Sequence, residues 1–208
     1  MLYSCKFPRP PTYTFSQYFE LPYAPADILL ELGCTYVHSQ LKLPEYQGKL
    51  DYIDFLSRYL PRNLNYVNPT SEAARREVLI APTLLEICAE TKSELNIEYP
   101  VNINNFLKGS FDYFIASPNA LIVIEAKSDL SREFTQLALE LIALDQWIDS
   151  PVTILYGAVT TGEDWRFGMF YRQEKKVVQD IKLYRVPEEL ESLLRVLIGI
   201  LITPIKGN

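Results

Sequence analysis

Three charged side chains accompany two apolar runs in the middle of the sequence, within FDYFIASPNALIVIEAK. Asp112 belongs to the first run, and Glu125 and Lys127 end the second. Carboxylates are ligands that hard cations such as Mg²⁺ prefer, and a lysine beside them would polarise a phosphate oxygen or position an attacking water. A cation held there activates water and offsets the charge that develops on a phosphodiester. These residue types therefore suit metal-assisted phosphodiester hydrolysis, provided that the fold brings them together.

Two strands and the turn between them decide whether the acids meet. The residues SPNA between the apolar runs are turn material, so strands near 109–116 and 121–127 are predicted to form a hairpin. A symmetric turn at that segment places Asp112 directly opposite Glu125, with Lys127 on the same face one pleat along. Opposed carboxylates repel each other unless a cation lies between them, so the hairpin predicts a cation site.

An acid-x-Lys triplet alone carries little information. Only the triplet that ends at Lys127 closes an apolar strand, faces an acid on the neighbouring strand and precedes a helical segment. A solvated Glu–Lys or Asp–Lys pair is the simpler interpretation of the other triplets. The chain has four such triplets: Glu90–Lys92, Glu125–Lys127, Glu174–Lys176 and Asp180–Lys182.

Helices and further strands are predicted on both sides of this hairpin. A long helix begins at an N-cap, Thr70 or Ser71, and should kink at Pro82, which removes one backbone hydrogen bond. A strand near 97–103 follows it. DLSREFTQLALELIALDQWI predicts a helix of about five turns, VTILYGAVTTG and WRFGMFYRQ a strand pair, and Glu188–Ile202 a last helix. This order predicts an α/β or α+β domain with a mixed sheet flanked by helices.

Residues 1–69 are predicted to be an N-terminal extension, and residues 70–208 the layered domain. The extension is rich in Pro and Tyr, which predicts short helices near 25–33 and 49–60 joined by fixed turns. The apolar stretch LLRVLIGILI near the C-terminus predicts a helix that is buried against the sheet or contacts a second copy of the chain.

Composition argues against several classes of protein. The net charge is −6, and the acids gather in the middle third, which disfavours strong non-specific binding to nucleic acid but permits a local patch. Cys5, Cys34 and Cys88 form no C-x-x-C pair and His38 is the single histidine, so neither a zinc site nor a disulfide framework is expected. No apolar run is long enough to span a membrane and the N-terminus lacks signal-peptide features, so a cytoplasmic protein is expected.

The pattern as a whole resembles the PD-(D/E)XK nuclease superfamily, in which an Asp on one strand precedes (D/E)-x-K on the next. More narrowly, it is similar to the N-terminal nuclease domain of type I restriction enzyme R subunits over roughly residues 71–172. Three stretches carry this similarity: SEAARREVLIAPTL, LIVIEAK and YGAVTTGEDWRF. The resemblance implies a restriction-endonuclease-like mixed sheet flanked by helices, with the Pro/Tyr-rich extension outside it.

The resemblance also implies roles for individual residues of the hairpin. Asp112 and Glu125 would be Mg²⁺ ligands, the Ala126 carbonyl would supply a further oxygen, and Lys127 would be the catalytic lysine, with Mn²⁺ as a substitute metal. Gln136 would help to order the site.

Two positions leave alternatives open. Glu140 stands four residues after the glutamine, where some relatives carry a tyrosine. Motif matching selects Glu72 as the acid of the first helix, whereas helical spacing favours Glu77, on the predicted inward face. A favourable charge near a helix N-terminus is the simpler interpretation of either acid.

The expected function is Mg²⁺-dependent endonuclease cleavage of DNA, duplex or branched, by a stand-alone protein. No Walker-type loop occurs in the sequence, so no motor is expected. The alternative is a non-catalytic interaction or accessory module that keeps the nuclease fold. A homodimer or a protein partner is compatible with both. Trp165, Arg166 and Phe167 suit either nucleic-acid stacking or an ordinary hairpin, and the hairpin is favoured.

Overall fold

The hairpin of the two apolar runs forms in the predicted register. Strands β3 (Leu107–Ala116) and β4 (Leu121–Ala126) are antiparallel, with Tyr113 opposite Ile124 and Ala116 opposite Leu121. Ser117 closes the turn: its hydroxyl accepts a hydrogen bond from the Ala120 N–H at 3.0 Å. The same register, continued by one pair, sets Asp112 against Glu125.

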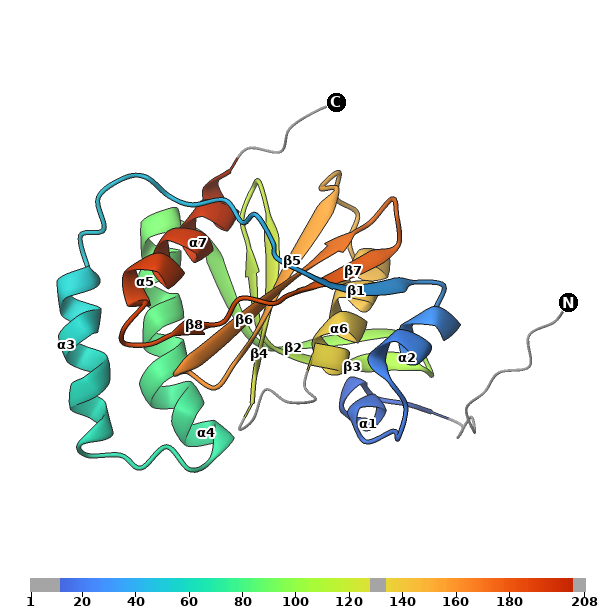
Figure 1. Ribbon diagram of the computed structural model, residues 1–208, viewed down its shortest axis with the longest axis horizontal. Coiled ribbons are helices and arrows are strands. Elements are labelled where there is room, and N and C mark those ends of the chain that lie inside the picture. The colour runs from blue at the N-terminus through green and yellow to red at the C-terminus, as the bar shows by residue number, and fades with distance from the viewer. Residues whose placement is uncertain (1–11, 128–133, 204–208) are drawn as a thin grey trace, which may run out of the picture.

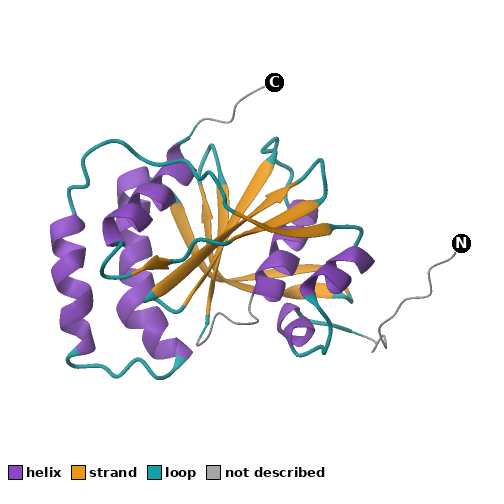
Figure 2. Ribbon diagram, viewed as in Figure 1, coloured by secondary structure: helices purple, strands orange, loops and turns teal. Residues whose placement is uncertain are grey.

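The sheet around this hairpin is mixed. The computed structural model describes residues 12–127 and 134–203, in which eight strands run in the order β1-β7-β6-β5-β4-β3-β2, with β8 beside β6 (Figures 1 and 2). Strand β4 is parallel to β5, β1 is parallel to β7, and the other pairs are antiparallel. The other strands are β1 (Thr35–Ser39), β2 (Glu94–Asn104), β5 (Ile154–Thr160), β6 (Asp164–Tyr171), β7 (Lys176–Asp180) and β8 (Tyr184–Arg185).

Helices cover both faces of the sheet (Figure 1). On one face lie α3 (Ile53–Leu64), α5 (Ala81–Thr91) and α7 (Leu190–Ile202), and on the other α1 (Phe15–Phe19), α2 (Pro25–Glu31) and α6 (Phe134–Trp147). A mixed sheet flanked by helices is therefore confirmed. The predicted start of the α6 helix, at residues 129–133, lies outside the described residues, as does Cys5, whereas Cys34 and Cys88 are buried thiols.

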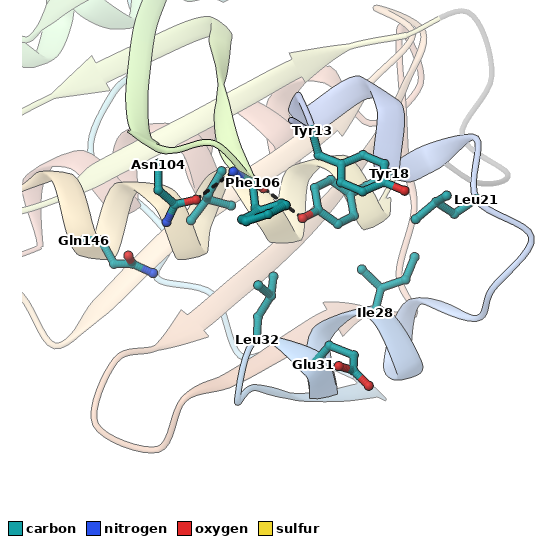
Figure 3. Close-up of a pocket in the computed structure, with 10 residues that line it drawn as sticks. Tyr13, Tyr18, Leu21, Ile28, Glu31, Leu32, Asn104, Phe106 and Gln146 are labelled. Atoms are coloured by element: carbon teal, nitrogen blue, oxygen red, sulfur yellow. Dashed lines mark hydrogen bonds between the residues drawn. The ribbon is translucent and has the colours of Figure 1, made fainter. Parts of the chain in front are cut away.

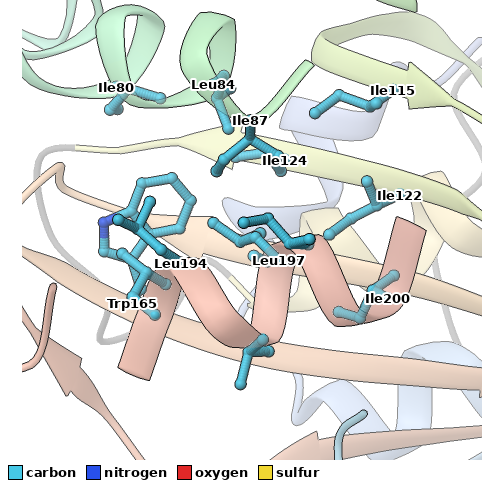
Figure 4. Packing of buried hydrophobic residues seen from close by; sticks show 14 of the residues in the cluster. Ile80, Leu84, Ile87, Ile115, Ile122, Ile124, Trp165, Leu194, Leu197 and Ile200 are labelled. Atoms are coloured by element: carbon cyan, nitrogen blue, oxygen red, sulfur yellow. The ribbon is translucent and has the colours of Figure 1, made fainter. Parts of the chain in front are cut away.

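Helix α7 is buried on almost every side. Leu194, Leu197 and Ile200 belong to the hydrophobic cluster that joins α7 to α5 and the sheet (Figure 4). The outer side is covered by the chain before α3: the Tyr46 N–H donates to the Arg195 carbonyl at 2.8 Å, and a Cβ on Gly199 would meet the Pro44 carbonyl oxygen at 2.4 Å. Burial within the chain therefore explains the all-round apolar sequence of this helix.

The close packing of this cluster makes even a single methyl group matter. Ile87 of α5 is fully buried in it. Replacing Ile87 by valine is expected to lower the free energy of unfolding by about 0.5–1.5 kcal/mol, because the lost methyl group leaves a void that the packed side chains fill only in part. Urea denaturation measures this. The same change at Ile97, which is 54 % exposed, is the control and should have almost no effect; equal losses at both positions would contradict the packing argument.

The helix that was predicted to kink at Pro82 contains a π-helical segment just before that residue. Helix α4 (Glu72–Arg75) leads into the π segment Arg76–Ile80 and then into α5, and the Ala81 N–H donates to the Arg76 carbonyl five residues back. A π turn changes the phase of the residues before it relative to those after it. Glu77 is exposed, so its predicted place on the inward face is wrong.

The N-terminal residues take part in all three layers. Within residues 12–69, β1 joins the sheet, α1 and α2 pack on the α6 face, and α3 packs on the opposite face. The predicted boundary at residue 70 falls between α3 and α4. None of the helices within residues 12–127 and 134–203 is long and apolar enough to cross a membrane.

Candidate functional site

The candidate residues gather where the parallel strands β4 and β5 end. Glu125 and Ala126 are the last residues of β4 and pair with Val159 and Thr160 of β5. The Lys127 N–H continues this pairing and donates to the Thr160 carbonyl at 2.8 Å. In open α/β sheets, ligands bind outside the carboxyl ends of such strands.

Asp112 is fixed beside β4 by its own carboxylate. The β3–β4 backbone pairing ends at Tyr113, and Asp112 Oδ2 instead accepts a hydrogen bond from the Ala126 N–H at 2.8 Å. Its other oxygen lies 3.4 Å from Arg76 Nη1, and Arg76 also pairs with Glu98. Burial raises the pKa of Asp112, although the Ala126 N–H and the Arg76 charge oppose the shift. The predicted proximity of Asp112 to the end of β4 is therefore present.

Glu125 is only 1 % exposed, and Lys127, Gln136 and Glu140 are its side-chain hydrogen-bond partners. Lys127 Nζ lies 2.6 Å from Glu125 Oε1, and Gln136 Nε2 donates to the same atom at 2.5 Å. Within the described part of the chain, the second oxygen, Oε2, is buried and has no hydrogen-bond partner. Burial and, after it, the charge of Asp112 raise the pKa of Glu125 to about 8.

Helix α6 contributes a third buried acid, Glu140. Gln136 Nε2 donates to Glu140 Oε1 at 2.9 Å, so the amide bridges Glu140 and Glu125. Glu140 Oε2 and Gln136 Oε1 are both buried without a partner among the residues described. Burial and then the charge of Glu125 raise the pKa of Glu140 well above its ordinary value, which favours its protonated form. The structure thus brings Gln136 into contact with Glu125 and Glu140.

Glu140 and Arg76 were given no site role from the sequence. The spacing of Gln136 and Glu140 puts them on one face of a helix, which was a usable signal. The sequence does not show that this face points into the protein, because polar helix positions usually face water. Arg76 lies at the start of the π segment, where the helix phase cannot be read from the sequence.

Lys127 remains a cation despite its position. Burial disfavours the charged ammonium, but attraction to Glu125 outweighs this and raises the pKa of Lys127 above its ordinary value. Glu72 also raises the pKa of Lys127, and it acts on Asp112, so the first-helix acid chosen by motif lies near both residues. Glu77, by contrast, is exposed.

The strand pair β5–β6 is an ordinary hairpin, as favoured. Trp165 and Phe167 are buried in the core between the sheet and α7, so neither ring is available to stack on a base. Three basic residues that follow β6, Arg172, Lys175 and Lys176, are paired with acids. Arg172 Nε and Lys175 Nζ each lie 2.6 Å from an oxygen of Asp145, and Lys176 pairs with Glu174.

The oxygen atoms at the end of β4 suit a hard divalent cation. Asp112 and Glu125 supply carboxylates, and the Ala126 carbonyl lies on the same strand edge as its N–H, which contacts Asp112. Glu125 Oε2, a buried acceptor that no described residue donates to, is the kind of atom that such an ion would satisfy. Among the described residues, no three His, Cys, Asp or Glu side chains are arranged to hold a metal ion, so water and substrate would have to complete the coordination.

A separate cavity of about 180 Å³ lies among α1, α2, α6 and the β2–β3 turn (Figure 3). Tyr13, Tyr18 and Phe106 line it, and Gln146 of α6 lies at its edge. Gln146 is ten residues along α6 from Gln136, or about 15 Å at the helical rise. The cavity is therefore not part of the Asp112–Glu125 site.

No protein-family model matches this chain, and neither does any curated protein or solved structure.

Proposed function

We propose that this protein is a divalent-cation-dependent nuclease that hydrolyses DNA phosphodiester bonds at the carboxyl end of β4. The observation that carries the proposal is Glu125, a buried acid beside Asp112 whose Oε2 has no partner among the described residues. Such an arrangement costs free energy in a protein without a ligand. The resemblance to PD-(D/E)XK nucleases supports the same conclusion, and with it a restriction-endonuclease-like fold.

Each residue of the site has a role in this proposal. Asp112, Glu125 and the Ala126 carbonyl hold Mg²⁺, or Mn²⁺ in its place. The ion would activate water and offset negative charge on the phosphate. Lys127 keeps its proton and presents a positive charge to a phosphate oxygen beside the ion. Gln136 holds the Glu125 carboxylate in place by donating to Oε1.

Glu72 and Glu140, near these ligands, affect the charge of the site. Glu72 lies close enough to Lys127 to favour its ammonium form. The raised pKa of Glu140 favours its neutral form, so Glu140 adds little negative charge beside Asp112 and Glu125, the two acids that would ionise to hold a divalent cation. The remaining charges of the site are then ones that a divalent cation and an anionic substrate together would neutralise.

Cleavage of DNA tests the proposal directly. Purified protein is incubated with supercoiled, linear and branched DNA in Mg²⁺ or Mn²⁺, with EDTA as the metal-free control. Nicking or linearisation is expected with the metals and not with EDTA. Asp112→Asn should abolish cleavage and weaken Mn²⁺ binding measured by calorimetry, because it removes a charged ligand without changing size. Cleavage that survives both Asp112→Asn and Glu125→Gln would overturn the assignment of the site.

A non-catalytic interaction module with the same fold is the second candidate. It is favoured by the internal cations of the site: Lys127 lies 2.6 Å from Glu125, and Arg76 lies 3.4 Å from Asp112. These pairs neutralise the acids without a metal. If neither DNA cleavage nor calorimetric Mn²⁺ binding occurs, this second function is supported and the nuclease is excluded. Duplex or branched DNA would be the substrate under the first proposal, and a homodimer and a cytoplasmic location are compatible with both.

A further inference from the structure

A row of residues on one face of the sheet leads from the candidate site to Arg166. Glu125 of β4 pairs with Val159 of β5, and Val159 pairs with Arg166 of β6. Direct partners on neighbouring strands share a face of the sheet, so all three side chains lie on the α6 face. Two strand spacings of about 4.8 Å put the Arg166 backbone about 10 Å from that of Glu125.

Arg166 differs from the other arginines that the structure describes. Each of those contacts a carboxylate, a backbone carbonyl or an aromatic ring, whereas Arg166 makes no hydrogen bond or ion pair in this part of the chain. Its Nε atom is buried and has no acceptor within residues 12–127 and 134–203. A half-buried guanidinium without an acceptor is unfavourable, which indicates a partner from outside the chain. The other arginines are Arg58, Arg62, Arg75, Arg76, Arg172, Arg185 and Arg195.

Polar side chains of β1 and β7 lie beside Arg166 on the same face. The Tyr36 hydroxyl donates to Gln179 Oε1, and His38 Nε2 lies 3.1 Å from the same oxygen. Gln179 Oε1 is therefore engaged, and its amide N–H groups remain as donors. Burial raises the pKa of Tyr36 to about 12 against the opposing charge of Arg166, which places the guanidinium near a neutral phenol.

The chemistry of this group selects an anion. Arg166 supplies a fixed positive charge, Gln179 supplies neutral donors, and no carboxylate is among the groups that act on Tyr36. Arginine binds phosphate with two parallel N–H donors, which a lysine cannot do. His38 is exposed at the open side of the group, and its Nε2 lies against Gln179 Oε1.

We propose that Arg166, with the amide of Gln179, forms a second phosphate subsite for the DNA strand that the Asp112–Glu125 site cleaves. The inference rests on the proposed function for the identity of the strand. A backbone separation of about 10 Å places this subsite close to the scissile phosphate, within reach of a neighbouring phosphate of the same strand. The subsite holds the backbone at that distance from the scissile phosphate and reads no base.

DNA binding without cleavage tests the subsite. A fluorescein-labelled duplex is titrated with protein in EDTA, and anisotropy gives the affinity at several salt concentrations. Arg166→Gln is expected to weaken binding about tenfold and to reduce the slope of log K against log salt by about one, because one phosphate contact is lost. Arg62→Gln, the same charge change on exposed α3, is the control and should leave both quantities unchanged. Arg166→Lys should restore the slope but not the full affinity.

The outcomes separate the subsite from the nuclease. Loss of affinity in Arg166→Gln together with wild-type protein that cuts no DNA would remove the nuclease and keep the subsite. If the wild-type protein cuts DNA but Arg166→Gln binds the duplex as tightly as Arg62→Gln, the subsite alone is overturned. A wild-type protein that does not bind the duplex would also overturn the subsite. Titration with inorganic phosphate distinguishes the ligand: phosphate binding that depends on Arg166, with DNA affinity independent of it, would also overturn the subsite for DNA.

Discussion

Replacing Lys127 by methionine is expected to slow DNA cleavage by about 10²- to 10³-fold, the usual effect of removing one charged group that stabilises a transition state. The ammonium is 2.6 Å from Glu125 and keeps its proton, so it can meet the negative charge that grows on the phosphate. Methionine preserves the length and the apolar stem of the side chain and removes only the charge. The initial rate of nicking of supercoiled DNA at saturating Mg²⁺ measures the effect.

A second lysine of the same local pattern is the matched control. Lys176 ends the triplet Glu174-x-Lys176 and pairs with its acid, as Lys127 does. Unlike the Lys127–Glu125 pair, this pair is partly exposed to solvent. Lys176→Met should cleave DNA at the wild-type rate. Equal losses in both variants would mean that overall charge, rather than the site, controls the activity. Thermal unfolding of Lys127→Met must also be checked, because the substitution leaves Glu125 without its nearest cation.

Stability is expected to fall as the pH rises from about 4.5 to 8, because a buried acid holds its proton in the folded protein. The pKa of Glu125 is raised from 4.5 to about 8 in the folded chain. Between these values the folded state binds more protons than the unfolded state, so the contribution of Glu125 to stability is full below pH 4.5 and is lost as the pH approaches 8. One pKa unit corresponds to about 1.4 kcal/mol, so the decline amounts to several kcal/mol. Glu140 acts in the same direction.

Urea unfolding across this pH range checks the expectation. Glu125→Gln should flatten much of the decline, since glutamine fits the same space and does not ionise. Glu90→Gln is the control, because Glu90 is exposed and belongs to another acid-x-Lys triplet. A wild-type protein whose stability stays constant over the range would show that Glu125 is solvated or paired in solution.

Much of the fold follows from local sequence. The hairpin at Asp112 could be placed because turn residues separate two apolar runs, and its register followed from the turn alone. Strand β1 could not be predicted: TYVHS is short, its residues are mostly exposed, and its partner β7 lies far along the chain. Parallel pairing between distant segments leaves no local pattern in either one.

The residues of the candidate site likewise differ in whether local sequence could predict them. Asp112, Glu125 and Lys127 come from the hairpin, whose geometry fixes which side chains share a face. Glu140 and Arg76 come from helices, and which way a helix face points depends on its packing against the rest of the chain. The assignment of Glu77 to the inward face failed for this reason, because the period of an ordinary α-helix was applied across a π segment.

That segment, Arg76–Ile80, makes the site sensitive to chain length. An α-helix turns by about 100° for each residue, so deleting one residue there would rotate Glu72 and Arg75 by about a quarter turn around the helix axis. Point substitutions in this segment would leave Glu72 near Lys127. A one-residue deletion would move Glu72 away from Lys127 with little change in the hydrophobic core. Insertions and deletions at this position therefore act on the charge around the lysine more strongly than changes of residue type.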